Sequence, residues 1–171
     1  MQQFGVIGLS VMGKNLALNV KNHGYSVSGF SIDKPEVDAL AKYEDKNLKP
    51  TYTWEEFVNS LEKPRKILIQ IMAGKPVDET LQKLLPLLDK GDILIDGGNS
   101  NFHDTNRRYK EMEKHGIHFI GMGVSGGEEG ALNGPALMPG GDEKAYEEVA
   151  PILEAMAAKT PTGQPCVGYI G

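Results

Sequence analysis

The chain has 171 residues, of which 40% are hydrophobic and 24% are charged, and its formal net charge at pH 7 is −5. This length fits one domain, and the composition excludes a disordered, coiled-coil or collagen-like chain. The negative balance argues against broad contact with nucleic acid, which needs a basic face, although a few backbone N–H groups can still hold one small anion.

Short apolar runs alternate with amphipathic stretches through the first 120 residues. The pattern predicts strands over residues 4–8, 25–30, 66–71, 93–96 and 117–120. It also predicts helices over residues 15–20, 35–43, 53–61, 78–88 and 104–115. The third of these helices opens on a capping box formed by Thr53 and Glu56. Strands that are apolar almost throughout are typical of a parallel sheet covered on both faces, so we expect a doubly wound α/β fold.

The composition changes after residue 120. Residues 121–141 include 8 glycines among 21 positions, which is too many for a regular element, and a loop of that length inside a compact domain is usually functional. We therefore expect a long functional loop there, followed by a helix over residues 144–158 and a last strand over residues 166–171.

A glycine-rich turn separates the first predicted strand from the first predicted helix. It matches the pattern G-x-G-x-x-G, with a serine at the middle glycine, in the residues Gly8, Leu9, Ser10, Val11, Met12 and Gly13. Such a turn lets the backbone approach a pyrophosphate at the N-terminus of the helix. Its place in the first βα unit, with a second strand ending about 20 residues later, predicts a dinucleotide site. A turn that only closes the βα unit is the alternative.

The residues after the second predicted strand leave the choice between NAD and NADP open. An acidic side chain there would accept a hydrogen bond from a ribose 2′-hydroxyl, whereas an arginine would bind a 2′-phosphate. Asp33 and Lys34 argue in opposite directions, and Ser31 can hydrogen-bond either group. A solvated turn ahead of Pro35 is the alternative.

Two further polar segments are candidates for ligand contact. Asn99 follows a predicted strand and so lies at the carboxyl edge of the sheet, where it can hydrogen-bond a hydroxylated substrate or a nicotinamide carboxamide. Residues 123–131 contain a glycine pair whose N–H groups can form an anion-binding nest beside Ser125. The alternatives are a turn residue ahead of the next helix and a flexible loop with a chance glycine pair.

Cysteine content and the first residues bear on compartment and metal binding. Cys166 is the only cysteine, so the chain can form neither an intrachain disulfide nor a four-cysteine metal site. Residues 1–3 lack the basic start of a signal peptide, and no apolar run approaches the roughly 18 residues that a membrane helix needs. We expect a cytoplasmic protein with no metal site and with neither a membrane nor nucleic acid as partner.

Several stretches closely resemble the decarboxylating 6-phosphogluconate dehydrogenases. The most specific read SGGEEGA and GPALMPGG, and the full set comprises residues 7–17, 95–100, 104–108, 123–131, 134–141 and 165–171. The resemblance covers the whole chain and implies that residues 1–171 form a Rossmann-like dinucleotide-binding domain, with a mostly parallel sheet and helices on both faces. For the parent enzyme it implies oxidation of 6-phosphogluconate by NADP⁺ and loss of CO₂ to give ribulose 5-phosphate, a step of the pentose phosphate pathway and of gluconate utilization.

The resemblance also implies which residues bind. Cofactor contacts would come from three stretches, which are Gly8, Leu9, Ser10, Val11, Met12 and Gly13, then Ser31, Ile32 and Asp33, and then Ile71, Met72 and Ala73. It further implies that Asn99 contacts both the nicotinamide and the substrate, and that 6-phosphogluconate is held by Ser125, Gly126 and Gly127.

The chain departs from the family pattern in ways that affect cofactor and catalysis. Ile32 stands where the family has its phosphate-binding arginine, and Met72 where it often has a lysine, so NADP is the expected cofactor and NAD is possible. The family's catalytic lysine and glutamate and its dimerising helical domain lie beyond Gly171, so we expect no catalytic residue here and an inactive, monomeric chain. The alternatives are another β-hydroxyacid dehydrogenase, such as 3-hydroxyisobutyrate dehydrogenase, and a nucleotide-binding module without catalysis.

Overall fold

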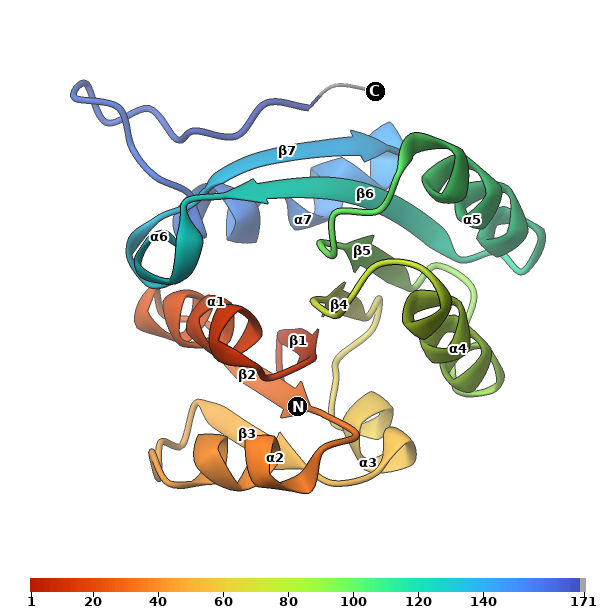
Figure 1. Cartoon of the computed structure of the whole chain (residues 1–171), viewed down its shortest axis with the longest axis horizontal. Coiled ribbons are helices and arrows are strands. Elements are labelled where there is room, and N and C mark those ends of the chain that lie inside the picture. Colours follow the sequence, from red (N-terminus) through yellow and green to blue (C-terminus); the bar gives the residue numbers. More distant parts are fainter. Residues whose placement is uncertain (170–171) are drawn as a thin grey trace.

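A seven-stranded sheet forms the centre of the computed structural model, which describes residues 1–169 (Figure 1). The strands are β1 (Phe4–Ile7), β2 (Val27–Phe30), β3 (Leu48–Thr51), β4 (Lys66–Ile69), β5 (Ile93–Asp96), β6 (His118–Ser125) and β7 (Ala136–Gly141). Their spatial order is β3-β2-β1-β4-β5-β6-β7, and every neighbouring pair is parallel except β6 with β7. The predicted doubly wound, mostly parallel α/β fold is confirmed.

Helices cover both faces of this sheet. They are α1 (Val11–Asn22), α2 (Lys34–Ala41), α3 (Trp54–Asn59), α4 (Lys75–Leu84), α5 (Phe102–Lys114), α6 (Gly127–Asn133) and α7 (Glu143–Met156). Because side chains alternate along a strand, Val6 and Leu68 join a buried cluster with α1, α2, α6 and α7. Their neighbours Ile7 and Ile69 join a second cluster with α3, α4 and α5. This alternation explains why the strands are apolar on both sides.

The predicted capping box at the start of α3 is present in a shifted form. Thr53 Oγ1 accepts a hydrogen bond from the Glu56 backbone N–H at 3.0 Å. The Glu56 carboxylate accepts in return from the backbone N–H of Tyr52 at 2.8 Å, one residue earlier than in the usual arrangement. The pair therefore fixes the entry into α3, which forms one wall of the site described below.

The prediction of a long loop over residues 121–141 is wrong, because that segment contains the end of β6, all of α6 and all of β7. Several of its glycines are required by close approaches within regular structure. A Cβ at Gly121 would lie 2.5 Å from Thr105 Cγ2, and one at Gly141 would lie 2.8 Å from the Phe119 carbonyl oxygen. Glycine in a strand often marks such a contact, and composition alone does not reveal it.

Two other strand predictions also differ from the structure. The edge strand β3 was not predicted, because it contains Lys49 and Pro50 and so lacks the apolar run of the central strands. The strand predicted over residues 166–171 reduces to a single parallel bridge between Val167 and Leu137, and residues 170–171 lie outside the described part of the chain. Within the described residues, no helix is long and apolar enough to cross a membrane.

Candidate functional site

The carboxyl ends of β1, β2 and β4 surround a cavity of ≈ 420 Å³, called the Gly8 cavity below. It brings together the three stretches that were predicted to meet, since its walls include Gly8 and Ser10, Ser31 to Asp33, and Ile71 with Met72. The rest of the wall comes from Ile7, Glu36, Trp54, Gln70, Pro76, Glu79, Thr80 and Lys83. This is the edge where open parallel sheets bind their ligands.

The glycines of the first turn are required by its geometry. Gly8 has φ +95°, and a Cβ there would lie 2.3 Å from the carbonyl oxygen of Gln70. A Cβ at Gly13 would lie only 1.8 Å from the Gly8 carbonyl oxygen. Both neighbours are backbone atoms that cannot rotate away, so any larger residue must displace the turn. The turn is thus built for close packing of α1 against β1 and β4.

The N-terminus of α1 opens toward this cavity with its first backbone N–H groups unpaired within the helix. Ser10 is the N-cap in extended conformation, and its side chain makes no capping hydrogen bond. No acidic residue occupies the first turn, so nothing in α1 neutralises the positive end of the helix dipole. The donor set fits a pyrophosphate, which such a helix end binds through N–H groups.

Three members of the predicted stretch play a packing role. Leu9 is 3% exposed and belongs to the core, and Met12 packs against the same cluster. Gly13 lies under the Gly8 carbonyl. None of the three lines the Gly8 cavity, and neither does the half-exposed Val11. Leu9, Met12 and Gly13 therefore support the shape of the turn by packing.

The residues after β2 are arranged by hydrogen bonds among themselves. Ser31 Oγ donates to Glu36 Oε1 at 2.7 Å and accepts from the Asp33 backbone N–H at 3.0 Å. Ile32 is 85% exposed, so its side chain projects into solvent at the mouth of the cavity. Lys34 faces Asp38, with Nζ 3.0 Å from Oδ2, and does not line the Gly8 cavity.

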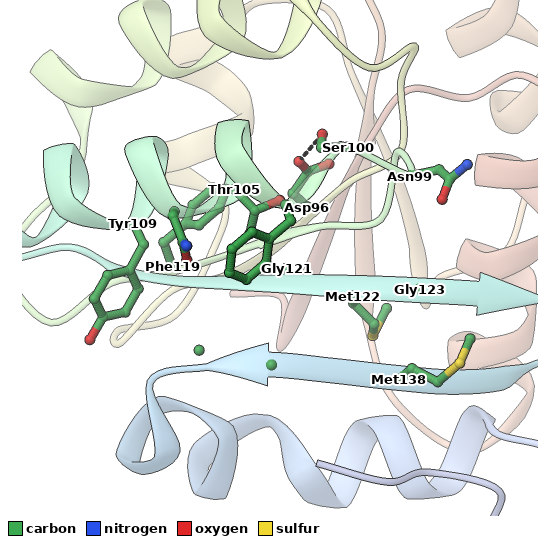
Figure 2. Close-up of a pocket in the computed structure, with 14 residues that line it drawn as sticks. Asp96, Asn99, Ser100, Thr105, Tyr109, Phe119, Gly121, Met122, Gly123 and Met138 are labelled. Atoms are coloured by element: carbon green, nitrogen blue, oxygen red, sulfur yellow. Dashed lines mark hydrogen bonds between the residues drawn. The ribbon is translucent and has the colours of Figure 1, made fainter. Parts of the chain in front are cut away.

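Asn99 lies at one end of a second cavity, of ≈ 520 Å³, called the Asn99 cavity below. Figure 2 shows Tyr109, Thr105 and Phe119 at the opposite end, with Met138 of β7 along one side. Asn99 is exposed and has φ +62°, a left-handed conformation that asparagine tolerates better than most residues. Its amide is therefore held outside the sheet and free to meet a ligand.

A buried arginine supports the turn that carries Asn99. Arg108 of α5 is 1% exposed and donates from Nε to Asp78 at 2.9 Å, from one terminal nitrogen to Ser100 Oγ at 2.9 Å, and from the other to the Gly74 carbonyl at 3.0 Å. Asp96 accepts from the Gly98 N–H and the Ser100 hydroxyl, the latter drawn as a dashed line in Figure 2. The network ties α4, α5 and the end of β5 together.

Gln70 and Ile71 lie between the Gly8 turn and the turn that carries Asn99. A Cβ at Gly97 would lie 2.3 Å from Gln70 Oε1, and a Cβ at Gly98 would lie 2.3 Å from the Ile71 carbonyl oxygen. The same two residues press against Gly8 on their other side. The Gly8 turn and the Asn99 turn are therefore neighbours across β4, although about 90 residues separate them in sequence.

The structure does not place every predicted contact in a cavity. Ser125, Gly126 and Gly127 are exposed at the junction of β6 and α6, where Gly126 and Gly127 have φ +141° and +65°. They line neither the Gly8 cavity nor the Asn99 cavity, and Ala73 lines neither as well. Two side-chain hydrogen bonds hold α6 against α1, one from Asn15 Nδ2 to the Glu128 carbonyl at 2.9 Å and one from Asn19 Nδ2 to the Ala131 carbonyl at 3.0 Å.

Several residues that line the Gly8 cavity were not predicted from the sequence. Glu36, Trp54, Gln70 and Lys83 come from α2, α3, the end of β4 and α4. They meet only because the crossovers bring these elements to one sheet edge. Glu36 has the sequence context of an ordinary acid in the first turn of a helix, so no local pattern distinguishes it.

The arginine network makes stability depend on pH. The hydrogen bond from Arg108 lowers the pKa of Asp78 below its usual 3.8, and Arg107 adds to this effect while partial burial opposes it. Because the folded-state pKa is the lower one, Asp78 contributes stability above about pH 3.8 and loses it as pH falls through the folded value.

We therefore expect Asp78→Asn to reduce the loss of stability between neutral and strongly acidic pH, measured as the free energy of unfolding in urea. Glu147→Gln, on an exposed position of α7, is the matched control and should leave the slope unchanged. Identical pH profiles for the wild type and Asp78→Asn would show that this carboxylate does not carry the dependence.

A model of one protein family matches almost all of the chain. Residues 3–171 match the model described as the NAD binding domain of 6-phosphogluconate dehydrogenase. The chain is 62% identical to 6-phosphogluconate dehydrogenase, decarboxylating, of Staphylococcus aureus strain Mu50, over 99% of this chain and 36% of that protein. It is 58% identical, over the same shares, to the enzyme of Bacillus subtilis strain 168 named as NADP(+)-dependent and decarboxylating. The chain thus spans about a third of the length of these relatives.

Solved structures agree with the sequence relatives. The 6-phosphogluconate dehydrogenase of Plasmodium falciparum, studied in its apo form and with NADP+ or 6-phosphogluconate, is 40% identical with a TM-score of 0.92, over 99% of this chain and 37% of that one. The 3-hydroxyisobutyrate dehydrogenase of Mycobacterium tuberculosis has a TM-score of 0.79 at 22% identity, covering 99% of this chain and 54% of that one. At that identity the second match supports only a shared fold.

Proposed function

The chain belongs to the 6-phosphogluconate dehydrogenase family, and on that premise we propose that it is the part of such an enzyme that binds the nicotinamide cofactor and presents it to 6-phosphogluconate. One observation carries the proposal: the Gly8–Gly13 turn and the uncapped N-terminus of α1 face a cavity that adjoins the Asn99 turn across β4. NADP⁺ is the cofactor named for the relatives from B. subtilis and P. falciparum.

Each part of the site has a role in this proposal. The backbone N–H groups at the start of α1 would hold the pyrophosphate, and the Gly8 cavity would hold the adenosine half. Asn99 would hydrogen-bond the nicotinamide carboxamide and the substrate from its exposed turn. The paired glycines beside Ser125 would donate N–H groups to 6-phosphogluconate. The bound cofactor supplies the chemistry by accepting a hydride from the substrate.

The described residues around Asn99 offer no free base for the proton that must leave the substrate hydroxyl. The lining of the Asn99 cavity contains no lysine, histidine or glutamate. Asp96 lies there, but its oxygens already accept from Gly98 and Ser100 and face Arg108. Burial raises the pKa of Tyr109, and Glu113 adds to the effect, so this phenol stays protonated at neutral pH. The base would thus come from a residue that does not line this cavity.

We accordingly expect the purified chain to bind a nicotinamide dinucleotide and to catalyse no oxidation of 6-phosphogluconate. Calorimetry measures the first, and absorbance of reduced nicotinamide measures the second, with a complete relative as positive control. Sustained cofactor reduction by this chain would contradict the assignment of catalysis to residues elsewhere. Absence of any dinucleotide binding would contradict the proposal as a whole.

On the same proposal we expect the chain to be a monomer in solution. The family resemblance places the dimer contacts in a helical domain that these residues do not match. Sedimentation at micromolar concentration would distinguish this state from a tight dimer formed by the cofactor-binding part alone.

A further inference from the structure

We propose that the mouth of the Gly8 cavity recognises the free 2′-hydroxyl of an adenosine ribose, so that this chain binds NAD⁺ more tightly than NADP⁺, with Glu36 as the specificity-determining residue. The inference rests on the proposed function, because it concerns the dinucleotide held by the same turn. It goes beyond that function by stating which of the two dinucleotides the residues of this chain select.

The position of the segment after β2 indicates that this segment distinguishes NAD⁺ from NADP⁺. In dinucleotide-binding sheets the residues that follow the second strand meet the 2′ position of the ribose. Here those residues are Ser31, Ile32 and Asp33, and all three line the Gly8 cavity together with Glu36. Recognition of a hydroxyl or a phosphate therefore depends on what these side chains can donate and accept.

The hydroxyl of Ser31 has no proton left for a phosphate. It donates to Glu36 Oε1 at 2.7 Å and accepts from the Asp33 N–H at 3.0 Å. A hydroxyl carries a single donor, so toward a ligand Ser31 can act only as an acceptor. A ribose 2′-hydroxyl can donate to such a group, whereas a phosphate, which carries about −1.5 to −2 charges at pH 7, can only accept.

Glu36 places a carboxylate directly beside Ser31 in the wall of the Gly8 cavity. It is half-buried in the first turn of α2, where the helix dipole favours a negative charge. Within the described residues, its second oxygen, Oε2, makes no hydrogen bond to other parts of the chain. That oxygen is an acceptor suited to a ribose hydroxyl, and its charge opposes a phosphate at the same point.

The wall of the Gly8 cavity carries more negative than positive side chains, which also disfavours a phosphate. Asp33, Glu36 and Glu79 contribute three carboxylates, and Lys83 contributes one ammonium group from the opposite wall on α4. Lys34 follows Asp33 in sequence, but it lies against Asp38 at 3.0 Å and over the Tyr52 ring at 5.6 Å. Tyr52 holds Asp38 from its other side with a 2.7 Å hydrogen bond. In the structure this cation therefore lies outside the Gly8 cavity.

Trp54 provides a direct readout of binding, since it is the only tryptophan in the chain and lines the same cavity. Its fluorescence is titrated with NAD⁺ and with NADP⁺ in parallel, and calorimetry repeats both titrations. We expect NAD⁺ to bind at least about tenfold more tightly, which is the order of effect of one hydrogen bond to a charged group.

Two variants test the residues themselves. Glu36→Gln keeps the side-chain shape and the acceptor for Ser31 but removes the charge. It should reduce the preference for NAD⁺ over NADP⁺ by about tenfold. Ile32→Arg adds a cation at an exposed position that packing does not constrain, and it should raise NADP⁺ affinity while leaving the fold intact. Glu148→Gln removes the same charge from an exposed site on α7 and should change neither affinity.

The outcomes separate this inference from the proposed function. Equal affinities, or tighter binding of NADP⁺, would overturn the inference while the proposed function survives. In that case Lys83→Gln would identify the lysine on α4 as the phosphate ligand by a selective loss of NADP⁺ binding. If neither dinucleotide binds, the proposed function fails and the inference falls with it.

Discussion

Replacing Arg108 by methionine should lower the free energy of unfolding by about 3–5 kcal/mol, the effect of breaking a buried ion pair from one side. The substitution leaves the Asp96 carboxylate, whose side chain is 1% exposed, without its cation. It also removes hydrogen bonds to Asp78, Ser100 and the Gly74 carbonyl. Equilibrium unfolding in urea measures the change.

The adjacent Arg107 supplies a matched control. It contacts the same Asp78 carboxylate at 3.2 Å, but its side chain is 55% exposed. Exposed pairs contribute about 0–1 kcal/mol, so Arg107→Met should lie in that range. Equal losses for the two variants would show that burial of Arg108 is not the source of its effect. The double variant Asp96→Asn with Arg108→Met should recover part of the loss, because it removes the uncompensated charge.

Gly13→Val should abolish measurable dinucleotide binding or weaken it by at least about tenfold, together with a loss of stability on the order of 1–3 kcal/mol. A Cβ at this position would lie 1.8 Å from the Gly8 carbonyl oxygen, and the methyl groups of valine would add to the overlap. The backbone of Gly8 must then move, which displaces the N–H groups that are proposed to hold the pyrophosphate.

Gly130→Val is the control for this substitution. A Cβ at Gly130 in α6 has no neighbour within 4 Å, and the residue does not have positive φ. The variant should keep its dinucleotide affinity, and α6 should not be weakened by propensity, because valine is a better helix former than glycine. Unchanged binding by a folded Gly13→Val protein would show that the glycine-rich turn is not the pyrophosphate site.

Most of the sheet could be predicted because its strands are buried on both faces. Residues 66–69 and 93–96 are apolar except for Lys66 at the start of the first run and Asp96 at the end of the second. Short apolar runs bounded by turns indicate buried strands of this kind. The edge strand β3 lacks this signal because Pro50 and Lys49 occupy it. The glycines of β6 and β7 were misinterpreted because the contact that requires them, such as Gly121 against Thr105, is tertiary.

The candidate site was predictable only where a local pattern carries it. The glycines of the Gly8 turn have the spacing that a tight turn at a helix N-terminus requires, and Asn99 follows a strand that could be identified. Glu36, Trp54 and Lys83 reach the same cavity from three different helices. No spacing along the chain links them, so their meeting depends on the strand order and the crossovers. The Ser31–Glu36 hydrogen bond has the same origin.

The most direct test of the central assignment is an NMR titration of the ¹⁵N-labelled chain with NAD⁺ and with NADP⁺. The account predicts that the largest shifts of backbone amide signals occur at Gly8, Ser10 and Gly13 and at residues 31–33, with a change in the Trp54 indole signal. Amides of α7, on the far side of the sheet from α4, should move little. Shifts concentrated away from the Gly8 turn, or none at millimolar dinucleotide, would contradict the claim that this turn binds the cofactor.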